Sequence, residues 1–154
     1  MNLEETYDLY GRQLYGHALA LTRHAQDAED VVQSVFLKCA GSKPGARVKD
    51  VEAYLHTAVR RESLRHVKRR RRFRPLEGGL LVTSVNGVTR DDAEKLNACL
   101  FRLPAKQREV VVLHVYEGMT FQHLGKVLGV SPDTAASRFR YAKEKLRRWL
   151  RGLG

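Results

Sequence analysis

The sequence has few of the residues that form disulfide bonds or metal sites. Only two cysteines occur among its 154 residues, Cys39 and Cys99, and none of the six histidines stands at metal-ligand spacing from a cysteine or another histidine. Two cysteines so far apart fit small, buried side chains in a reducing compartment better than a disulfide or a zinc site. The sequence therefore predicts no metal ion and no other cofactor.

Long apolar segments are also missing. No segment approaches the roughly 18 consecutive apolar residues that a membrane-spanning helix needs. The N-terminal segment carries Glu4, Glu5 and Asp8, whereas a signal peptide carries basic residues there. We therefore expect a cytoplasmic protein without membrane insertion.

The signatures of common catalytic sites are absent as well. The sequence has no glycine-rich phosphate-binding loop, no nucleophile elbow and no pair of carboxylates in a pattern typical of an active-site cleft. The protein is therefore predicted not to be an enzyme, and no residue is assigned a catalytic role.

What the sequence does have is an excess of positive charge. Lysine and arginine together number 28 against 17 acidic residues, which gives a formal net charge of +11. An excess of this size indicates a polyanionic partner, and nucleic acid is a more common one than an anionic membrane surface.

Apolar residues recur at helical spacing in two blocks of the chain. In the first block, residues 3–40 predict two helices with a break at 22–25, and residues 51–72 predict a third helix whose other face is basic. The second block resumes at Asp91 and runs towards the C-terminus. No segment alternates convincingly with a period of two residues, so the predicted fold is all-α.

Between the blocks the helical pattern gives way to a segment with one proline and three glycines. Such a composition is typical of a flexible connection. We therefore predict two small helical lobes, residues 1–73 and 92–154, joined by a flexible linker at residues 74–91.

The second block ends in the pattern of a helix-turn-helix. A short helix at Thr120–Leu128 is followed by the turn Gly129–Val130 and by a longer helix at Ser131–Leu150. Glycine in the turn permits a positive φ, and the Ser-Pro pair after it caps the second helix and presets its first φ. In such motifs the second helix enters the major groove of DNA. An ordinary helical hairpin shares this spacing, and the basic charge favours the DNA-binding interpretation.

Residues 103–150, LPAKQREVVVLHVYEGMTFQHLGKVLGVSPDTAASRFRYAKEKLRRWL, closely resemble region 4 of the extracytoplasmic-function (ECF) sigma factors of the sigma-70 family. In that family this lobe recognises the minus-thirty-five element of a promoter. The resemblance implies that minus-thirty-five DNA is contacted by Ser131, Asp133, Thr134, Ser137, Arg138 and Arg140.

Residues 27–40, DAEDVVQSVFLKCA, look like the region 2 helix with which these sigma factors dock on the clamp of the polymerase β′ subunit. The resemblance assigns polar docking positions to Asp30 and Gln33, with Val32 and Phe36 as apolar support. Taken alone, an acid and a glutamine near the start of a helix are more typical of a solvated face.

Residues 51–75, VEAYLHTAVRRESLRHVKRRRRFRP, stand where the family has the helix that reads the minus-ten element and melts the promoter. The residues that the resemblance assigns to minus-ten DNA are Arg60, Arg61, Arg65, His66, Lys68 and Arg69. A basic run also binds any nucleic acid non-specifically or is simply solvated. The family often has asparagine and aspartate where Arg61 and Arg65 stand, so promoter melting or base choice is expected to differ here.

The resemblance covers nearly the whole chain and implies a transcription initiation factor. Its partners would be core RNA polymerase, contacted at the β′ clamp and the β flap, together with promoter DNA and an anti-sigma factor. The alternative is a helix-turn-helix regulator that does not bind polymerase and needs only the second lobe. One departure from the family concerns Gly125, where an alanine is usual; glycine costs about 1 kcal/mol of helix preference but keeps the helix crossing tight.

Overall fold

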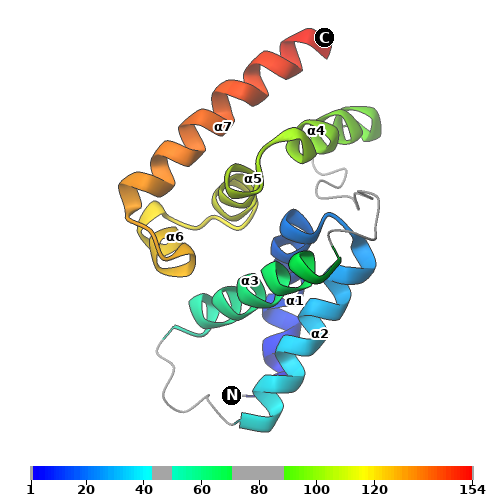
Figure 1. Ribbon diagram of the computed structural model, residues 1–154, viewed down its shortest axis with the longest axis vertical. Coiled ribbons are helices and arrows are strands. Elements are labelled where there is room, and N and C mark those ends of the chain that lie inside the picture. The colour runs from blue at the N-terminus through cyan, green and yellow to red at the C-terminus, as the bar shows by residue number, and fades with distance from the viewer. Residues whose placement is uncertain (1, 43–49, 71–88, 154) are drawn as a thin grey trace.

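A computed structural model describes residues 2–42, 50–70 and 89–153, and these residues contain helices and no strand. The first lobe, as the name is used below, consists of α1 (Leu3–Thr22), α2 (Ala25–Ser42) and α3 (Val51–Arg70). The second lobe consists of α4 (Arg90–Arg102), α5 (Ala105–Val111), the π-helical turn η2 (Val112–Tyr116), α6 (Phe121–Leu128) and α7 (Pro132–Leu153). The all-α prediction is confirmed, and Figure 1 shows the two groups of helices.

The first lobe is a bundle of three helices around one apolar core. Asn2 caps the N-terminus of α1, because its side-chain oxygen accepts hydrogen bonds from the backbone N–H groups of Glu4 (3.0 Å) and Glu5 (3.3 Å). Arg23 follows the last residue of α1 and takes a left-handed conformation with φ of 59°. The apolar core has buried members from all three helices: Leu14, Ala18, Leu19, Ala28, Val31, Val32, Val35, Cys39, Leu55 and Val59.

The second lobe places α7 across the other helices of the lobe (Figure 1). Thr89 caps α4 by accepting a hydrogen bond from the N–H of Asp92 at 3.1 Å. Pro104 immediately precedes α5, and its ψ of 146° is extended. Two apolar clusters hold α7 in place, one against α4 and α5 and the other against α5, η2 and α6.

The helix-turn-helix prediction is confirmed in its details. Thr120 caps α6 by accepting the N–H of His123 at 3.0 Å, and Gly129 ends that helix with φ of 69°. Ser131 accepts the N–H of Thr134 at 3.1 Å and so caps α7, which begins at Pro132. The turn therefore holds α7 at a defined angle to α6.

The two lobes are in direct contact. Phe101 of α4 packs against the core of the first lobe, and Ala53 of α3 packs against a core cluster of the second lobe. Helix α3 runs beneath α5 and α6 in the view of Figure 1. The predicted linker, residues 74–91, lies almost wholly outside the described residues; α4 already begins at Arg90.

Within the described ranges, no helix combines the length and the apolar character needed to cross a membrane. Over the same ranges, no group of three or more His, Cys, Asp or Glu side chains is placed to hold a metal ion.

Candidate nucleic-acid interface

The first turns of α7 present a polar face to solvent. Asp133, Thr134 and Arg140 are exposed, and Ser137 and Arg138 are half-buried. On the opposite face, Ala135 and Ala142 are fully buried. The exposed hydroxyl of Ser131 contacts Oγ1 of Thr134 at 2.9 Å in addition to its capping bond, so part of its hydrogen-bonding capacity serves the helix start. This face is open for contact with the edges of base pairs.

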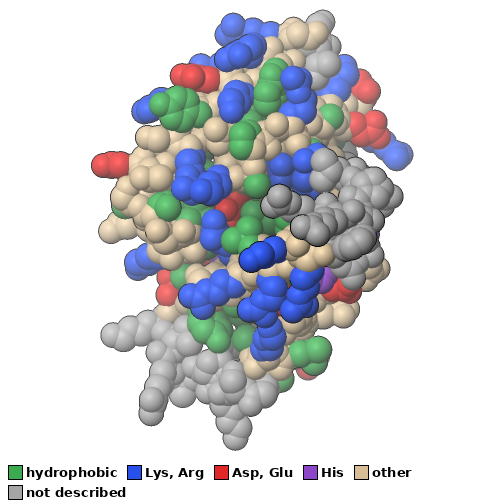
Figure 2. All heavy atoms as spheres, in the orientation of Figure 1, with side chains coloured by type: hydrophobic (Ala, Val, Ile, Leu, Met, Phe, Trp, Pro, Cys, Tyr) green, Lys and Arg blue, Asp and Glu red, His purple; other side chains and the backbone are tan. Residues whose placement is uncertain are grey.

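The remainder of α7 carries a basic stripe. Exposed cations continue along the helix at Lys143, Arg147, Arg148 and Arg151. Figure 2 shows Lys and Arg side chains spread over both lobes on the face in view, with few acidic ones between them. Such a stripe suits contacts with the phosphates on either side of a groove.

Helix α3 presents a second basic face. Its exposed cations at helical spacing are Arg61, Arg65, Lys68 and Arg69, and the apolar Leu64 is exposed among them. Arg65 also lies 3.4 Å from the carboxylate of Glu62, which in turn contacts Lys38 at 2.9 Å. Beside these cations the pKa of Glu62 is lowered, chiefly by the hydrogen bond from Lys38. Four of the six residues assigned to minus-ten DNA thus share one accessible surface.

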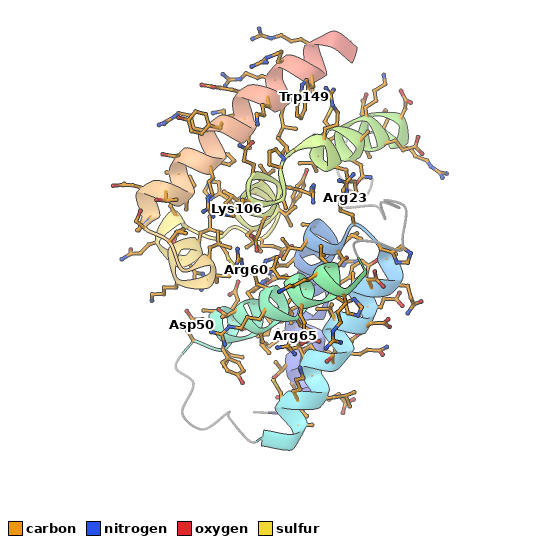
Figure 3. The ribbon with its side chains drawn as sticks, viewed as in Figure 1. Arg23, Asp50, Arg60, Arg65, Lys106 and Trp149 are labelled. Carbon is orange, nitrogen blue, oxygen red and sulfur yellow. The ribbon has the colours of Figure 1, made fainter. Side chains whose placement is uncertain are left out.

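The other two residues assigned to minus-ten DNA point elsewhere. His66 is half-buried, and its Nδ1 lies 3.9 Å from a carboxylate oxygen of Asp27. Arg60 faces the second lobe, where its Nε donates to both carboxylate oxygens of Glu109 at 3.0 and 3.3 Å. Figure 3 shows Arg60 on the side of α3 next to α5 and Arg65 away from it.

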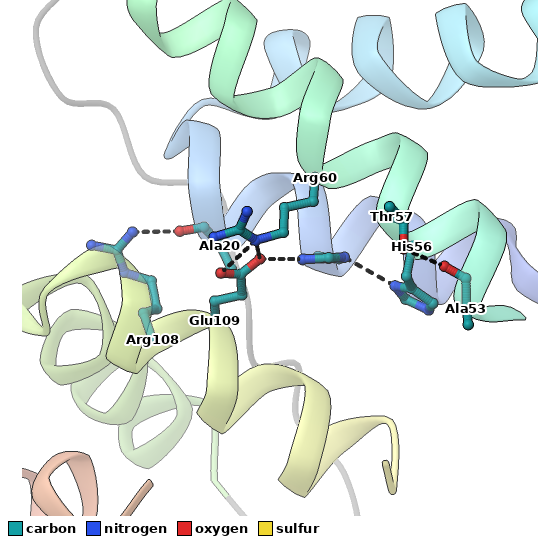
Figure 4. Close-up of polar contacts among 8 residues, drawn as sticks. Ala20, Ala53, His56, Thr57, Arg60, Arg108 and Glu109 are labelled. Atoms are coloured by element: carbon teal, nitrogen blue, oxygen red, sulfur yellow. Dashed lines mark hydrogen bonds and ion pairs between the residues drawn. The ribbon is translucent and has the colours of Figure 1, made fainter. Parts of the chain in front are cut away.

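Glu109 belongs to a buried polar cluster between the lobes, which we term the inter-lobe cluster: His17, His56, Arg60 and Glu109. Oε2 of Glu109 lies 2.7 Å from Nε2 of His17, and Nδ1 of His17 lies 2.9 Å from Nδ1 of His56. The side chains of Glu109, His17 and His56 are fully buried. Figure 4 shows the Glu109 carboxylate beside Arg60, with His56 further along the chain of contacts. No local sequence pattern links His17 with Glu109, which stands 92 residues further along the chain.

The hydrogen bonds of the cluster restrict its protonation. A contact between two Nδ1 atoms requires one donor and one acceptor, so at least one of the two histidines is neutral. Burial lowers the pKa of His56 to about 3, and the neighbouring His17 and His123 act in the same direction. His56 is therefore neutral at physiological pH, and Glu109 forms an ion pair with Arg60.

Other charged groups surround the cluster at the lobe contact. Arg108 of α5 donates across the contact to the carbonyl oxygen of Ala20 near the end of α1. His123 of α6 lies 3.1 Å from the carboxylate of Asp50 at the start of α3. Burial, together with the charge of Glu52, raises the pKa of Glu117. The contact between the lobes thus combines buried polar groups with apolar packing at Phe101 and Ala53.

The neutral state of His56 predicts a loss of stability in mild acid. The pKa of this imidazole is about 3 in the folded protein and near 6.5 when it is exposed, so unfolding takes up a proton below pH 6.5. Because the unfolded state binds this proton more tightly than the folded state, the free energy of unfolding decreases as the pH falls from 6.5 towards 3. Between pH 7 and pH 5 the decrease is about 2 kcal/mol.

His56→Gln removes this titratable group. Between pH 7 and pH 5, the free energy of unfolding of this variant is expected to decrease by about 2 kcal/mol less than that of the wild-type protein. Urea denaturation of both proteins at pH 7 and pH 5 measures the difference. Glu117 acts in the opposite sense, because its raised pKa favours folding on acidification, but it does so in both proteins and cancels. An equal pH dependence would show that His56 is not the responsible group.

The residues assigned to polymerase docking lie on α2. Gln33 is exposed, while Asp30 is half-buried and accepts a hydrogen bond from Nε2 of Gln26 at 3.0 Å. Phe36 packs edge-on against Tyr7 at 5.2 Å between ring centroids. Val32 is only 4% exposed, so it supports this surface from beneath and is not itself open to a protein partner.

A groove of about 510 Å³ adjoins the docking positions, between α1 and α2. Gln33 and Val32 form part of its wall, and Tyr7, Arg12 and Glu29 contribute side chains from both helices. The described structure thus places Gln33 and Val32, but not Asp30, in the wall of a concave, mixed polar and apolar surface, which is a form suited to a protein contact.

Together, the helix-turn-helix and the two basic faces define a DNA-binding protein of the transcription-factor class. Residues 6–73 match the family described as sigma-70 region 2, and residues 93–146 match the family described as sigma-70 region 4.

Full-length similarity leads to the same family. The chain is 32% identical to the ECF RNA polymerase sigma factor SigL of Mycobacterium tuberculosis, over 96% of this chain and 88% of that protein. It is 28% identical to the RNA polymerase sigma factor CarQ of Myxococcus xanthus, with the same two coverages. The chain therefore belongs to the sigma-70 family, among its ECF sigma factors, and functions in transcription initiation.

Two solved structures share the fold at lower identity. The sigma factor RpoE in complex with the anti-sigma factor NepR, from Bartonella quintana, matches with a TM-score of 0.79 over 96% of both chains, at 22% identity. CnrH in complex with the cytosolic domain of CnrY matches with a TM-score of 0.71 over 97% of this chain and 88% of that one, also at 22% identity.

Proposed function

We propose that the two lobes of this sigma factor divide the work of initiation. The first lobe docks on core RNA polymerase through α2 and engages minus-ten DNA through α3. The second lobe reads minus-thirty-five duplex DNA through α7 and contacts the β flap. The observation that carries this proposal is the coexistence in one chain of an exposed basic helix in each lobe and a separate, less basic surface on α2.

For docking, the proposed contact surface consists of Asp30, Gln33 and Phe36, with Val32 beneath them. The groove between α1 and α2 next to Gln33 gives a partner side chain a place to insert. Well-packed insertions of this kind contribute most of the binding energy at protein interfaces.

For DNA, the proposed contacts differ between the lobes. In α7, Asp133, Thr134 and Ser137 are short enough to approach base edges, and Arg140 reaches bases or phosphates. In α3, the exposed face formed by Arg61, Arg65, Lys68 and Arg69 follows the phosphates of the separated strand. Binding that favours separated strands over duplex shifts the equilibrium towards the melted promoter.

No covalent step is assigned to this chain, since polymerisation belongs to the core enzyme, and its proposed place is the cytoplasm, where polymerase and chromosome are. A protein inhibitor of the anti-sigma type is a further proposed partner, because one solved structure with this fold is a complex of a sigma factor with the anti-sigma factor NepR. A helix-turn-helix regulator that does not bind polymerase is not favoured, since it leaves the sigma-70 region 2 match of residues 6–73 unexplained.

The decisive experiment is reconstituted transcription. Purified protein and sigma-free core polymerase are incubated with DNA fragments from upstream of the protein's own gene. Defined transcripts that require both proteins are the expected result. Failure of the protein to bind core polymerase would overturn the proposal in favour of the regulator.

The assigned surfaces predict two separable defects. Asp30→Ala with Gln33→Ala is expected to weaken core binding by on the order of tenfold, because truncation of central contacts at an interface has such costs. Arg138→Ala with Arg140→Ala serves as the matched control: it keeps core binding but weakens duplex binding and lowers the salt slope by about 1 for each lost phosphate contact. Fluorescence anisotropy with labelled core and labelled duplex measures both. Unchanged core affinity in the first variant would place docking elsewhere.

A further inference from the structure

Tyr141 stands on the outer side of α7 and has no part in the apolar packing of that helix. Its side chain is 52% exposed. The other two aromatic residues of α7, Phe139 and Trp149, are half-buried and pack against the core clusters of the second lobe. The ring of Tyr141 is therefore available to a binding partner of α7.

Helical spacing places Tyr141 on the side of α7 that points away from the core. At 3.6 residues per turn, Asp133, Ser137, Tyr141 and Glu144 fall within about 80° of the helix circumference, opposite the fully buried Ala142. We term these four residues the outward strip. Two of them are carboxylates, which repel phosphates. The outward strip is therefore suited to face base edges and not the DNA backbone.

Cations stand on both sides of the outward strip. Lys143 and Arg147 lie about 80–120° to one side of Ser137, and Arg138 and Lys145 lie about 80–100° to the other side. A helix in a major groove has a phosphate backbone along each flank and base edges in front of it. The distribution of charge around α7 fits this placement, with Tyr141 directed at the bases.

The ring of Tyr141 is held in place by its neighbour. The guanidinium carbon of Arg140 lies 5.4 Å from the centre of the ring, which is a cation–π contact. A side chain that is already ordered loses less entropy when it binds. Tyr141 thus presents a preorganised apolar surface on the outward strip.

The length of the tyrosine side chain suits its position along α7. In helix-turn-helix proteins the first residues of the second helix lie nearest to the base edges. Thr134 and Ser137 have short side chains and stand in the first two turns of α7. Tyr141 stands one turn later, about 6 Å further along the helix axis than Ser137. A longer side chain is needed there to reach a base.

We propose that Tyr141 is a specificity-determining residue, whose ring packs against the C5-methyl group of a thymine in the upstream duplex element. Thymine is the one standard DNA base with a methyl group in the major groove, and apolar side chains recognise it through that group. The contact adds an apolar position to the polar contacts proposed for Asp133, Thr134 and Ser137. This inference rests on the proposed function, in which α7 reads minus-thirty-five DNA.

Replacing thymine by uracil tests the contact, because uracil forms the same base pair and lacks only the methyl group. On a promoter fragment found by reconstituted transcription, each thymine of the upstream element is replaced singly by uracil on either strand. Binding of each fragment by the full-length protein together with core polymerase is then measured. At one thymine, wild-type binding is expected to weaken about fourfold, which is the effect of losing one buried methyl group.

The same fragments are then bound by protein variants. Tyr141→Ala is expected to bind the thymine and uracil forms of that position equally well, whereas Tyr141→Phe keeps the aromatic ring and the fourfold ratio. Tyr116→Ala is the matched control, because Tyr116 is a 42% exposed tyrosine of the second lobe outside α7. It loses the same atoms and is expected to keep the ratio. Each ratio compares two DNAs on one protein, so differences in folding or in polymerase affinity cancel.

The outcomes separate this inference from the proposed function. If transcription does not depend on an upstream duplex element, the proposed role of α7 fails and the inference fails with it. If the element is required but no uracil substitution weakens wild-type binding, the inference alone is wrong. It is also wrong if Tyr141→Ala weakens binding of every fragment and keeps the wild-type ratio, because the tyrosine then contacts the DNA backbone.

Discussion

Arg108→Met is expected to destabilise the protein by about 3–5 kcal/mol, because it removes a buried charge that several backbone groups depend on. Arg108 is 2% exposed, and its guanidinium donates to three carbonyl oxygens. These are Leu100 at 3.0 Å, Leu103 at 2.8 Å and Ala20 in the other lobe. Methionine fills the space of the stem but leaves these oxygens without their charged donor.

The charge of Arg108 is maintained despite its burial. Burial and the nearby Arg23 lower its pKa only to about 10, so the guanidinium is protonated at neutral pH. Its charge is compensated by carbonyl dipoles, including those at the C-terminal end of α1. The ring of Phe101 at 5.3 Å contributes a cation–π contact. Arg108 therefore joins α4, α5 and α1 at one point.

Thermal and urea unfolding measure the effect. Arg108→Lys keeps the positive charge, but a single ammonium group does not match three acceptors that are arranged for a planar guanidinium. This variant is therefore expected to lose more than half of the unfolding free energy that Arg108→Met loses. Arg90→Met is the control, because Arg90 is 89% exposed, and its stability is expected to equal that of wild type. If Arg108→Met were as stable as Arg90→Met, the three carbonyl contacts would have no role in folding.

Gly125→Ala is expected to destabilise the second lobe by about 1–2 kcal/mol, although alanine is the better helix former by about 1 kcal/mol. A Cβ atom at Gly125 would lie 2.7 Å from the backbone oxygen of Val130 in the turn of the helix-turn-helix. A backbone oxygen cannot move aside as a flexible side chain can. The turn would have to open, and α7 would tilt away from its place against α6.

This prediction has a matched control in the same chain. Gly152 lies in the last turn of α7 with nothing within 4 Å of an added Cβ, so Gly152→Ala is expected to be neutral or slightly stabilising. Denaturation of both variants gives the stabilities, and duplex binding reports the tilt of α7 as reduced affinity in Gly125→Ala alone. A Gly125→Ala protein more stable than wild type would mean that the turn adapts at no cost.

Much of the local structure followed from the sequence because its causes are local. Helix spacing predicted α1, α2 and α3 nearly to their ends, and the residue types themselves indicated the cap at Ser131 and the left-handed Gly129. Gly125 was expected to keep the helix crossing tight, but only the position of Val130 shows that alanine would collide there.

The sequence did not distinguish the orientations of the cations on α3. Arg61, Arg65, Lys68 and Arg69 are exposed together, as a basic helix face predicts. Arg60 is next to them in the sequence and equally basic, yet it turns towards Glu109. Residue type alone does not distinguish a cation that faces solvent from one that pairs with a buried carboxylate.

The sequence by itself determined the helices, the helix-turn-helix and the excess of positive charge, since each depends on residues within a few positions of one another or on composition. Only the tertiary structure decided that the lobes close on each other and that Glu109 unites them. His17 and Glu109 are 92 residues apart, and no local pattern links them. Their pairing arises because folding brings α1, α3 and α5 to one place, where a buried carboxylate requires a donor.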